Sequence, residues 1–187
     1  MRRTLTVFLL MLPLLARAGG EAPLQEQARE VVREFAGTLR ETLTRHLSAG
    51  GPVEAIEACR LKAPAIAAGI GEKRGWEVGR TSLRTRNPAN DPDPWERRVL
   101  EQFEARKAAG EDPARLEYHE VIERQGRRLF RYMKAIPTAP LCLTCHGGSL
   151  APELATRLDE LYPQDRARGF SVGDLRGAFT LQRELED

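Results

Sequence analysis

The feature that most constrains the fold of this chain is a regular apolar spacing in its first third. Between Ala22 and Leu47, apolar side chains recur at steps of three and four residues, which predicts one long amphipathic helix. The residues of this stripe are Leu24, Ala28, Val31, Val32, Phe35, Leu39, Leu43 and Leu47. The pattern ends at Gly50-Gly51-Pro52, and a second helix is predicted to begin at this proline. Because proline has no amide hydrogen, we expect a kink or break at Pro64.

Segments with β-favouring residues and segments with helical spacing follow one another in the rest of the chain. Strands are predicted at residues 76–83, 116–122, 128–136 and near 177–181, and helices at residues 95–109 and 152–161. Gln125-Gly126 predicts a hairpin between the second and third strands, and the turn formers of residues 86–94 predict a loop. This order of elements predicts an α+β fold with an antiparallel sheet.

The N-terminus has the pattern of an export signal. A basic start is followed by the apolar run Leu5–Leu15 and by Ala16-Arg17-Ala18, which predicts a signal peptide over residues 1–18 and a periplasmic location. The apolar run is about eleven residues long, whereas a membrane-spanning helix needs ~20, so no stable membrane span is expected in the mature chain. Residues 19–187 are predicted to form a single domain.

The charge of the mature chain gives no reason to expect a nucleic-acid partner. Removal of Arg2, Arg3 and Arg17 with the signal peptide leaves 26 basic and 27 acidic residues. A chain that is nearly neutral lacks the basic surplus with which proteins attract nucleic acid or anionic membranes.

One motif carries a specific chemistry. Cys142-Leu143-Thr144-Cys145-His146 is the C-x-x-C-H signature for covalent haem attachment. Two thiols separated by two residues can add to the two vinyl groups of one haem, and the next residue then reaches the iron. The export signal agrees with this interpretation, because such haems are attached outside the cytoplasm. We therefore predict one haem c per chain.

Two alternatives compete with haem at this motif. A zinc site could use Cys142, Cys145 and Cys59 with one histidine, although adjacent residues such as Cys145 and His146 do not easily reach one tetrahedral ion together. Dithiol redox chemistry would be expected at a helix start after a βαβ unit, whereas Pro137-Thr138-Ala139-Pro140 precedes the motif here.

The second iron ligand is left open by the spacing alone. Cys59, Met133, His46 and His119 are all available in the mature chain. Cys59 has small alanine neighbours on the predicted helix, which would leave room for a porphyrin edge, but it could equally be an inert buried cysteine.

An arginine-rich segment is a candidate for holding the haem propionates. Arg80-Thr81-Ser82, Arg84 and Arg86 supply guanidinium groups, which pair well with carboxylates. The alternative interpretation is a solvated basic strand that leads into a turn-rich loop.

Several segments together resemble a known family. They are residues 55–59, 79–82, 86–90, 94–96, 142–147 and 173–178. In these segments the chain resembles bacterial single-haem c-type cytochromes with a PAS-like fold, long catalogued as a domain of unknown function. The resemblance implies a PAS-like five-stranded antiparallel sheet flanked by helices. It also implies that the iron is bound by the motif histidine, here His146, and by a cysteine thiolate, here Cys59.

The expected function follows from this ligand pair. A thiolate favours ferric iron, so a low reduction potential and one-electron transfer to an unidentified periplasmic redox partner are expected. The alternative is a redox or diatomic-gas sensor that acts through a separate partner protein. Enzyme activity is not expected, because no group of catalytic side chains beside the haem can be named from the sequence.

Overall fold

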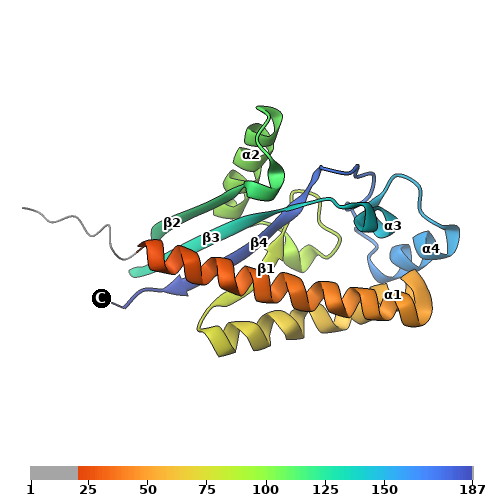
Figure 1. Cartoon of the computed structure of the whole chain (residues 1–187), viewed down its shortest axis with the longest axis horizontal. Helices are drawn as coiled ribbons and strands as arrows, with labels where there is room; N and C mark the ends of the chain where they lie inside the picture. The colour runs from red at the N-terminus through yellow and green to blue at the C-terminus, as the bar shows by residue number, and fades with distance from the viewer. Residues whose placement is uncertain (1–20, 187) are drawn as a thin grey trace, which may run out of the picture.

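The computed structural model describes residues 21–186, so the predicted signal peptide lies outside the described part (Figure 1). The helices and strands, in chain order, are α1 Glu21–Arg74, β1 Glu77–Thr81, α2 Pro94–Ala108, β2 Glu117–Arg124, β3 Arg127–Pro137, α3 Leu143–His146, α4 Pro152–Leu161 and β4 Leu175–Glu184. Short 3-10 turns occupy Pro88–Asn90, Pro113–Arg115 and Pro140–Cys142. None of the described helices is both long and apolar enough to cross a membrane.

The strands form one antiparallel sheet in the order β1-β4-β3-β2. The predicted hairpin is confirmed: Arg124 pairs with Arg127 across Gln125 and Gly126, whose φ angles of 55° and 73° suit a tight two-residue turn. The α+β class is also confirmed. The described residues form four strands, however, and not the five of the implied PAS-like sheet, because the segment between β3 and β4 forms short helices and loops.

Helix α1 is a pair of helical arms joined at Gly51, where φ is 75° and ψ is −168° (Figure 1). Glycine adopts this positive φ without steric cost, so the predicted boundary at Gly50-Gly51-Pro52 is confirmed. The break expected at Pro64 is wrong, since α1 continues through it to Arg74 and Gly51 is its only non-helical position. The second arm is held in place by packing of Ala63 and Ile70, which offsets the one lost backbone hydrogen bond.

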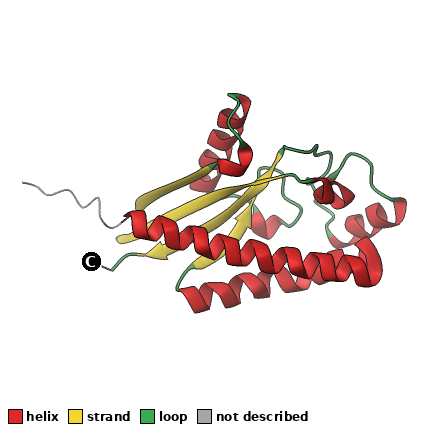
Figure 2. Cartoon of the chain, in the orientation of Figure 1, coloured by secondary structure: helices red, strands yellow, loops and turns green. Residues whose placement is uncertain are grey.

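Helices cover both faces of the sheet (Figure 2). Residues of β3 alternate between the two faces, as expected for a strand. Phe130 and Tyr132 pack with Phe35 of α1, whereas Met133 and Ala135 pack with α2. The sheet is therefore the middle layer of three.

A third apolar cluster lies beyond the end of the sheet. Ile56 of α1 packs there against Leu154 and Leu158 of α4, and Cys145 of α3 contacts this cluster. In Figure 1, α3, α4 and the turn between the two arms of α1 lie together at this end of the molecule. This arrangement brings the C-x-x-C-H motif close to the arm of α1 that carries Cys59.

Candidate functional site

The C-x-x-C-H motif forms a compact turn of helix. Pro140–Cys142 is a 3-10 turn, and α3 follows directly and ends at His146. Gly147 closes the turn in a position where a Cβ atom would collide with the Leu143 carbonyl. The side chains of Cys142, Cys145 and His146 are all half-buried, and both cysteines are free thiols.

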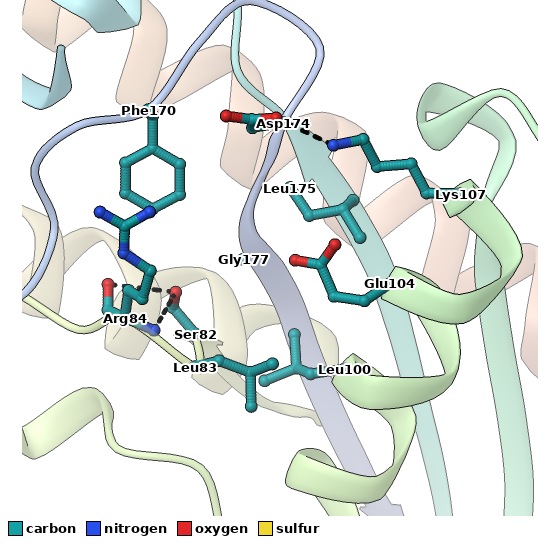
Figure 3. A pocket seen from close by; sticks show the side chains of 10 residues that line it. All are labelled: Ser82, Leu83, Arg84, Leu100, Glu104, Lys107, Phe170, Asp174, Leu175 and Gly177. Carbon is teal, nitrogen blue, oxygen red and sulfur yellow. Dashed lines mark hydrogen bonds and ion pairs between the residues drawn. The ribbon is translucent and has the colours of Figure 1, made fainter. Parts of the chain in front are cut away.

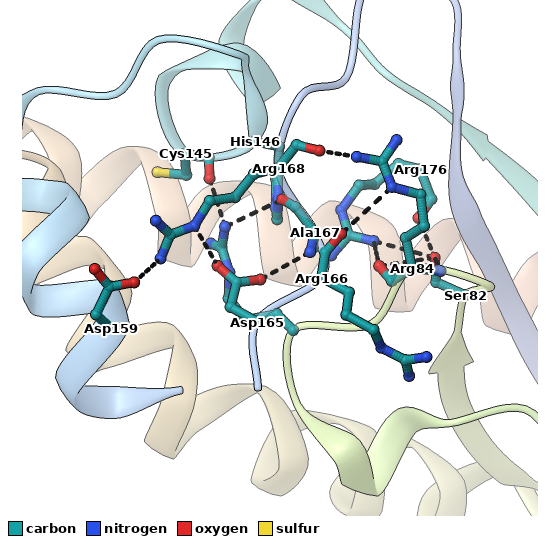
Figure 4. A network of polar contacts seen from close by, with 11 residues as sticks. Ser82, Arg84, Cys145, His146, Asp159, Asp165, Arg166, Ala167, Arg168 and Arg176 are labelled. Carbon is teal, nitrogen blue, oxygen red and sulfur yellow. Dashed lines mark hydrogen bonds and ion pairs between the residues drawn. The ribbon is translucent and has the colours of Figure 1, made fainter. Parts of the chain in front are cut away.

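The imidazole of His146 is oriented by the backbone of a distant loop (Figure 4). Its Nδ1 lies 2.7 Å from the carbonyl oxygen of Ala167. A carbonyl only accepts hydrogen bonds, so Nδ1 carries the proton and Nε2 keeps its lone pair. Burial, with smaller contributions from Arg176 and Arg86, lowers the pKa of His146 to about 3. The ring is therefore neutral at pH 7, with the tautomer that a metal ligand requires.

A buried acid holds the loop that orients His146. The side chain of Asp165 is only 2% exposed, and it accepts hydrogen bonds from Arg86 at 3.2 Å, Arg168 at 2.9 Å and the Ala167 amide at 2.8 Å. Arg86 also donates to the carbonyl of Cys145 at 2.5 Å. Through Asp165 and Arg86, the motif and the Ala167 loop form one hydrogen-bonded unit.

Cys59 lies near enough to the motif for its charge to affect the pKa of Cys145. Burial raises the pKa of the Cys59 thiol, and the nearby Arg80 guanidinium opposes this shift. Burial also raises the pKa of Cys145, where Arg86 opposes the shift and the neighbouring Cys59 and Cys142 add to it. Cys59 therefore lies near Cys145, on the arm of α1 that packs against the same apolar cluster.

The predicted arginine cluster is divided by the fold. Arg84 donates to the carbonyls of Arg166 and Arg168, and its guanidinium carbon lies 4.2 Å from the centre of the Phe170 ring. Arg86 is paired with Asp165. Neither guanidinium is free, so most of the predicted propionate cluster is engaged within the protein.

Arg80 is the member of this cluster that keeps its guanidinium available. It forms no hydrogen bond or ion pair with any residue in the described part of the chain, although Cys59 and Tyr162 lie near it. Much of its surface is open to solvent, yet surrounding protein atoms lower its pKa by desolvation. Its guanidinium is therefore accessible to a ligand from solvent.

A further arginine at the site was not predicted. Arg176 follows Leu175, the first residue of β4, and its Nη1 makes only long contacts of 3.4 Å with the Ser82 hydroxyl and the Arg84 carbonyl. Its Nε is buried without a partner among the described atoms. Burial, and then the like charges of Arg86 and Arg80, lower the pKa of Arg176 to about 10. The sequence places it 90 residues after Arg86, so no local signal linked the two.

The other candidate iron ligands are engaged elsewhere. Met133 is fully buried between the sheet and α2. The His119 ring stacks on Phe130 at 5.5 Å, and the two ring nitrogens of His46 contact Glu54 and Lys62. Within residues 21–186, no three His, Cys, Asp or Glu side chains are grouped to hold a metal ion.

A separate cavity of about 230 Å³ lies beside the site (Figure 3). Arg84 and Phe170 contribute to its wall, and Lys107 donates to Asp174 at its rim over 2.9 Å. The Phe170 ring also meets the His146 ring edge-on, with centroids 6.2 Å apart. The cavity therefore shares one aromatic side chain with the site, but the motif cysteines do not line it.

The chain has recognisable relatives. A solved structure, described as that of the cyanobacterial heme-protein Tll0287, aligns with 92% of this chain and 99% of its own length, at 22% identity and a TM-score of 0.62. This likeness shows a shared fold. None of the curated proteins matches the chain. The Tll0287-like family model matches residues 18–182, and the chain therefore belongs to the Tll0287-like family, as the resemblance of its segments to single-haem cytochromes predicted.

Proposed function

We propose that this chain is a periplasmic single-haem c-type cytochrome that transfers one electron at low potential. In this proposal Cys142 and Cys145 attach the haem, and His146 and Cys59 bind its iron. The observation that carries the proposal is His146: a neutral imidazole, with Nδ1 bonded to Ala167 and Nε2 free, directly after two thiols. The solved relative described as a heme-protein supports the choice of cofactor.

The residues at the site fit a haem. The site offers three free thiols: Cys142 and Cys145 of the motif would form thioether bonds, and the third, Cys59, would be left as a ligand. Two arginines, Arg80 and Arg176, have no acidic partner in the described part of the chain, and haem carries two carboxylates. The bound haem would supply a one-electron iron couple.

The protein residues would set the properties of that couple. The Ala167 carbonyl would fix the His146 ring and increase its basicity as a ligand. Arg80 beside Cys59 would stabilise the thiolate form of this cysteine. A thiolate ligand favours ferric iron, which is the reason to propose a low potential. If His146 and Cys59 both bound the iron, no ligand position would be open to a gas, which favours electron relay over the sensor alternative.

Attachment of the haem is tested by intact mass. The full chain, exported in a bacterium that matures c-type cytochromes, is expected to gain the mass of one haem and to show a reduced c-type absorbance spectrum. Cys142→Ala with Cys145→Ala should abolish the mass gain, since no thioether bond can form. Wild-type protein without the added mass would refute the proposal.

The Cys59 ligand is tested separately. Cys59→Ala should retain the covalent haem but change the ferric spectrum and raise the reduction potential, because an anionic donor is lost. Cys59→Ser provides a matched variant of similar size. An unchanged ferric spectrum would exclude Cys59 as a ligand while leaving the attachment intact. Rapid carbon monoxide binding by the reduced wild-type protein would favour the sensor alternative.

A further inference from the structure

Two guanidinium groups from neighbouring strands lie near each other, and neither has an acidic partner in the described part of the chain. Arg80 lies on β1 and Arg176 lies on β4, and these strands are paired, with Arg80 opposite Phe179 and Thr81 opposite Ala178. We propose that Arg80 and Arg176 together form the receptor for both carboxylates of the haem, and so fix which edge of the haem faces these strands. This inference rests on the proposed function and adds residues that determine the orientation of the cofactor.

Arg80 and Arg176 are cations without an acidic partner in the described part of the chain. Arg176 has a buried Nε with no partner among the described atoms, and Arg80 has no hydrogen bond or ion pair with a described residue. Burial lowers the pKa of Arg176, and the like charges of Arg86 and Arg80 lower it further. A buried guanidinium normally has an acidic partner, which Arg176 lacks among the described residues, whereas the exposed Arg80 is open to a ligand. An anionic ligand would supply this missing charge.

The neighbouring arginines, in contrast, are bound to other groups of the protein. Arg86 has Asp165, Arg168 has Asp159 and Asp165, and Arg84 has two backbone carbonyls. These three guanidinium groups hold the protein together at the site. Arg80 and Arg176, on the paired strands β1 and β4, are not held in this way, and their charge is opposite to that of the haem carboxylates.

The surrounding backbone holds Arg176 in place. The Ser82 hydroxyl donates to the Arg176 carbonyl at 2.8 Å, and the next residue, Gly177, packs so closely on Thr81 that a Cβ would collide with its carbonyl. Arg176 also lies over the Phe170 ring, with the guanidinium carbon 5.3 Å from the ring centre. Its guanidinium is thus held in position before any carboxylate binds, which reduces the entropic cost of binding.

The test uses the haem-loaded full chain with Arg80→Gln, Arg176→Gln and the double variant. Loss of a cation beside the haem should stabilise the ferric state, so each substitution should shift the reduction potential to more negative values, and the double variant further. The propionate bending bands of the resonance Raman spectrum should shift in the same variants. Arg176→Lys keeps the charge, so its potential should stay close to wild type while its propionate bands shift.

Matched controls separate a receptor from a structural role. Arg183→Gln removes a guanidinium from the other end of β4, where it donates to Gln27, and Arg166→Gln removes one that pairs with Asp91; both should leave the propionate bands unchanged. Propionate bands that do not respond to Arg80→Gln or Arg176→Gln would overturn the inference. Haem absent from the wild-type chain would instead refute the proposed function, so the two failures are distinguishable.

Discussion

At the scale of single residues, Asp165 connects several parts of the site, because it accepts hydrogen bonds from Arg86, Arg168 and the Ala167 amide. Asp165→Ala would leave Arg86, whose side chain is 11% exposed, without its acid. Loss of one partner of a buried ion pair typically costs about 3–5 kcal/mol, and part of this should appear here as a lower free energy of unfolding. Denaturant unfolding of the haem-loaded protein measures the effect. Glu41→Ala is the control, because its pair with Arg45 is exposed and should contribute under about 1 kcal/mol.

Some residues of the site could be identified from the sequence alone, and others could not. Cys142, Cys145 and His146 were predictable because their chemistry depends on their spacing along the chain. Cys59 came from the resemblance, and it stays a prediction; in the structure it lies near Cys145. The arginines were harder to assign, since whether a guanidinium is paired depends on residues far away in sequence. Arg84 and Arg86 look alike locally, and only the fold gives one to backbone carbonyls and the other to Asp165.

At the scale of secondary structure elements, Gly177 controls the approach of β4 to β1. Its φ is 153°, and a Cβ there would collide with the Thr81 carbonyl. Gly177→Ala is therefore expected to lower the free energy of unfolding by roughly 2–4 kcal/mol, from backbone strain and from the clash together. Thermal unfolding checks this. Gly173→Ala shares a positive φ of 86° but has open space around it, so it should cost only about 1 kcal/mol.

The helices, strands and turns that were predicted correctly are those determined by residues close together in the sequence. The hairpin at Gln125-Gly126, helix α4 and the turn at Gly51 all depend on residues within a few positions. Two expectations failed for reasons that are not local. Helix α1 continues through Pro64 because tertiary packing holds its second arm. The fifth strand implied by the resemblance is not among the described elements, since that part of the chain forms the turns around the motif.

At the scale of the whole molecule, α1 connects the site to the opposite end of the sheet. The motif lies near the turn of α1, whereas the start of α1 is tied to the sheet by one ionic cluster (Figure 1). Arg29 of α1 donates to Glu117 of β2 at 3.1 Å, and the buried Tyr132 hydroxyl donates to the same carboxylate at 2.6 Å. Substitutions in this cluster should therefore lower the free energy of unfolding of the whole molecule without changing the chemistry of the site.

This separation can be tested by pH. Hydrogen bonding to Arg29, aided by Tyr132 and opposed by burial, lowers the pKa of Glu117 from its ordinary value of 4.5 to about 2. A carboxylate with a lowered folded-state pKa stabilises the fold fully above its unfolded-state pKa, and this contribution disappears as the pH falls from about 4.5 to about 2. Arg29 is 39% exposed, so solvent screening reduces the contribution to about 2 kcal/mol or less. Glu117→Gln should therefore be less stable than wild type by this amount at pH 7, with the difference shrinking below pH 4.5. Unfolding free energies of both proteins across this range measure it, and a difference independent of pH would contradict the assignment.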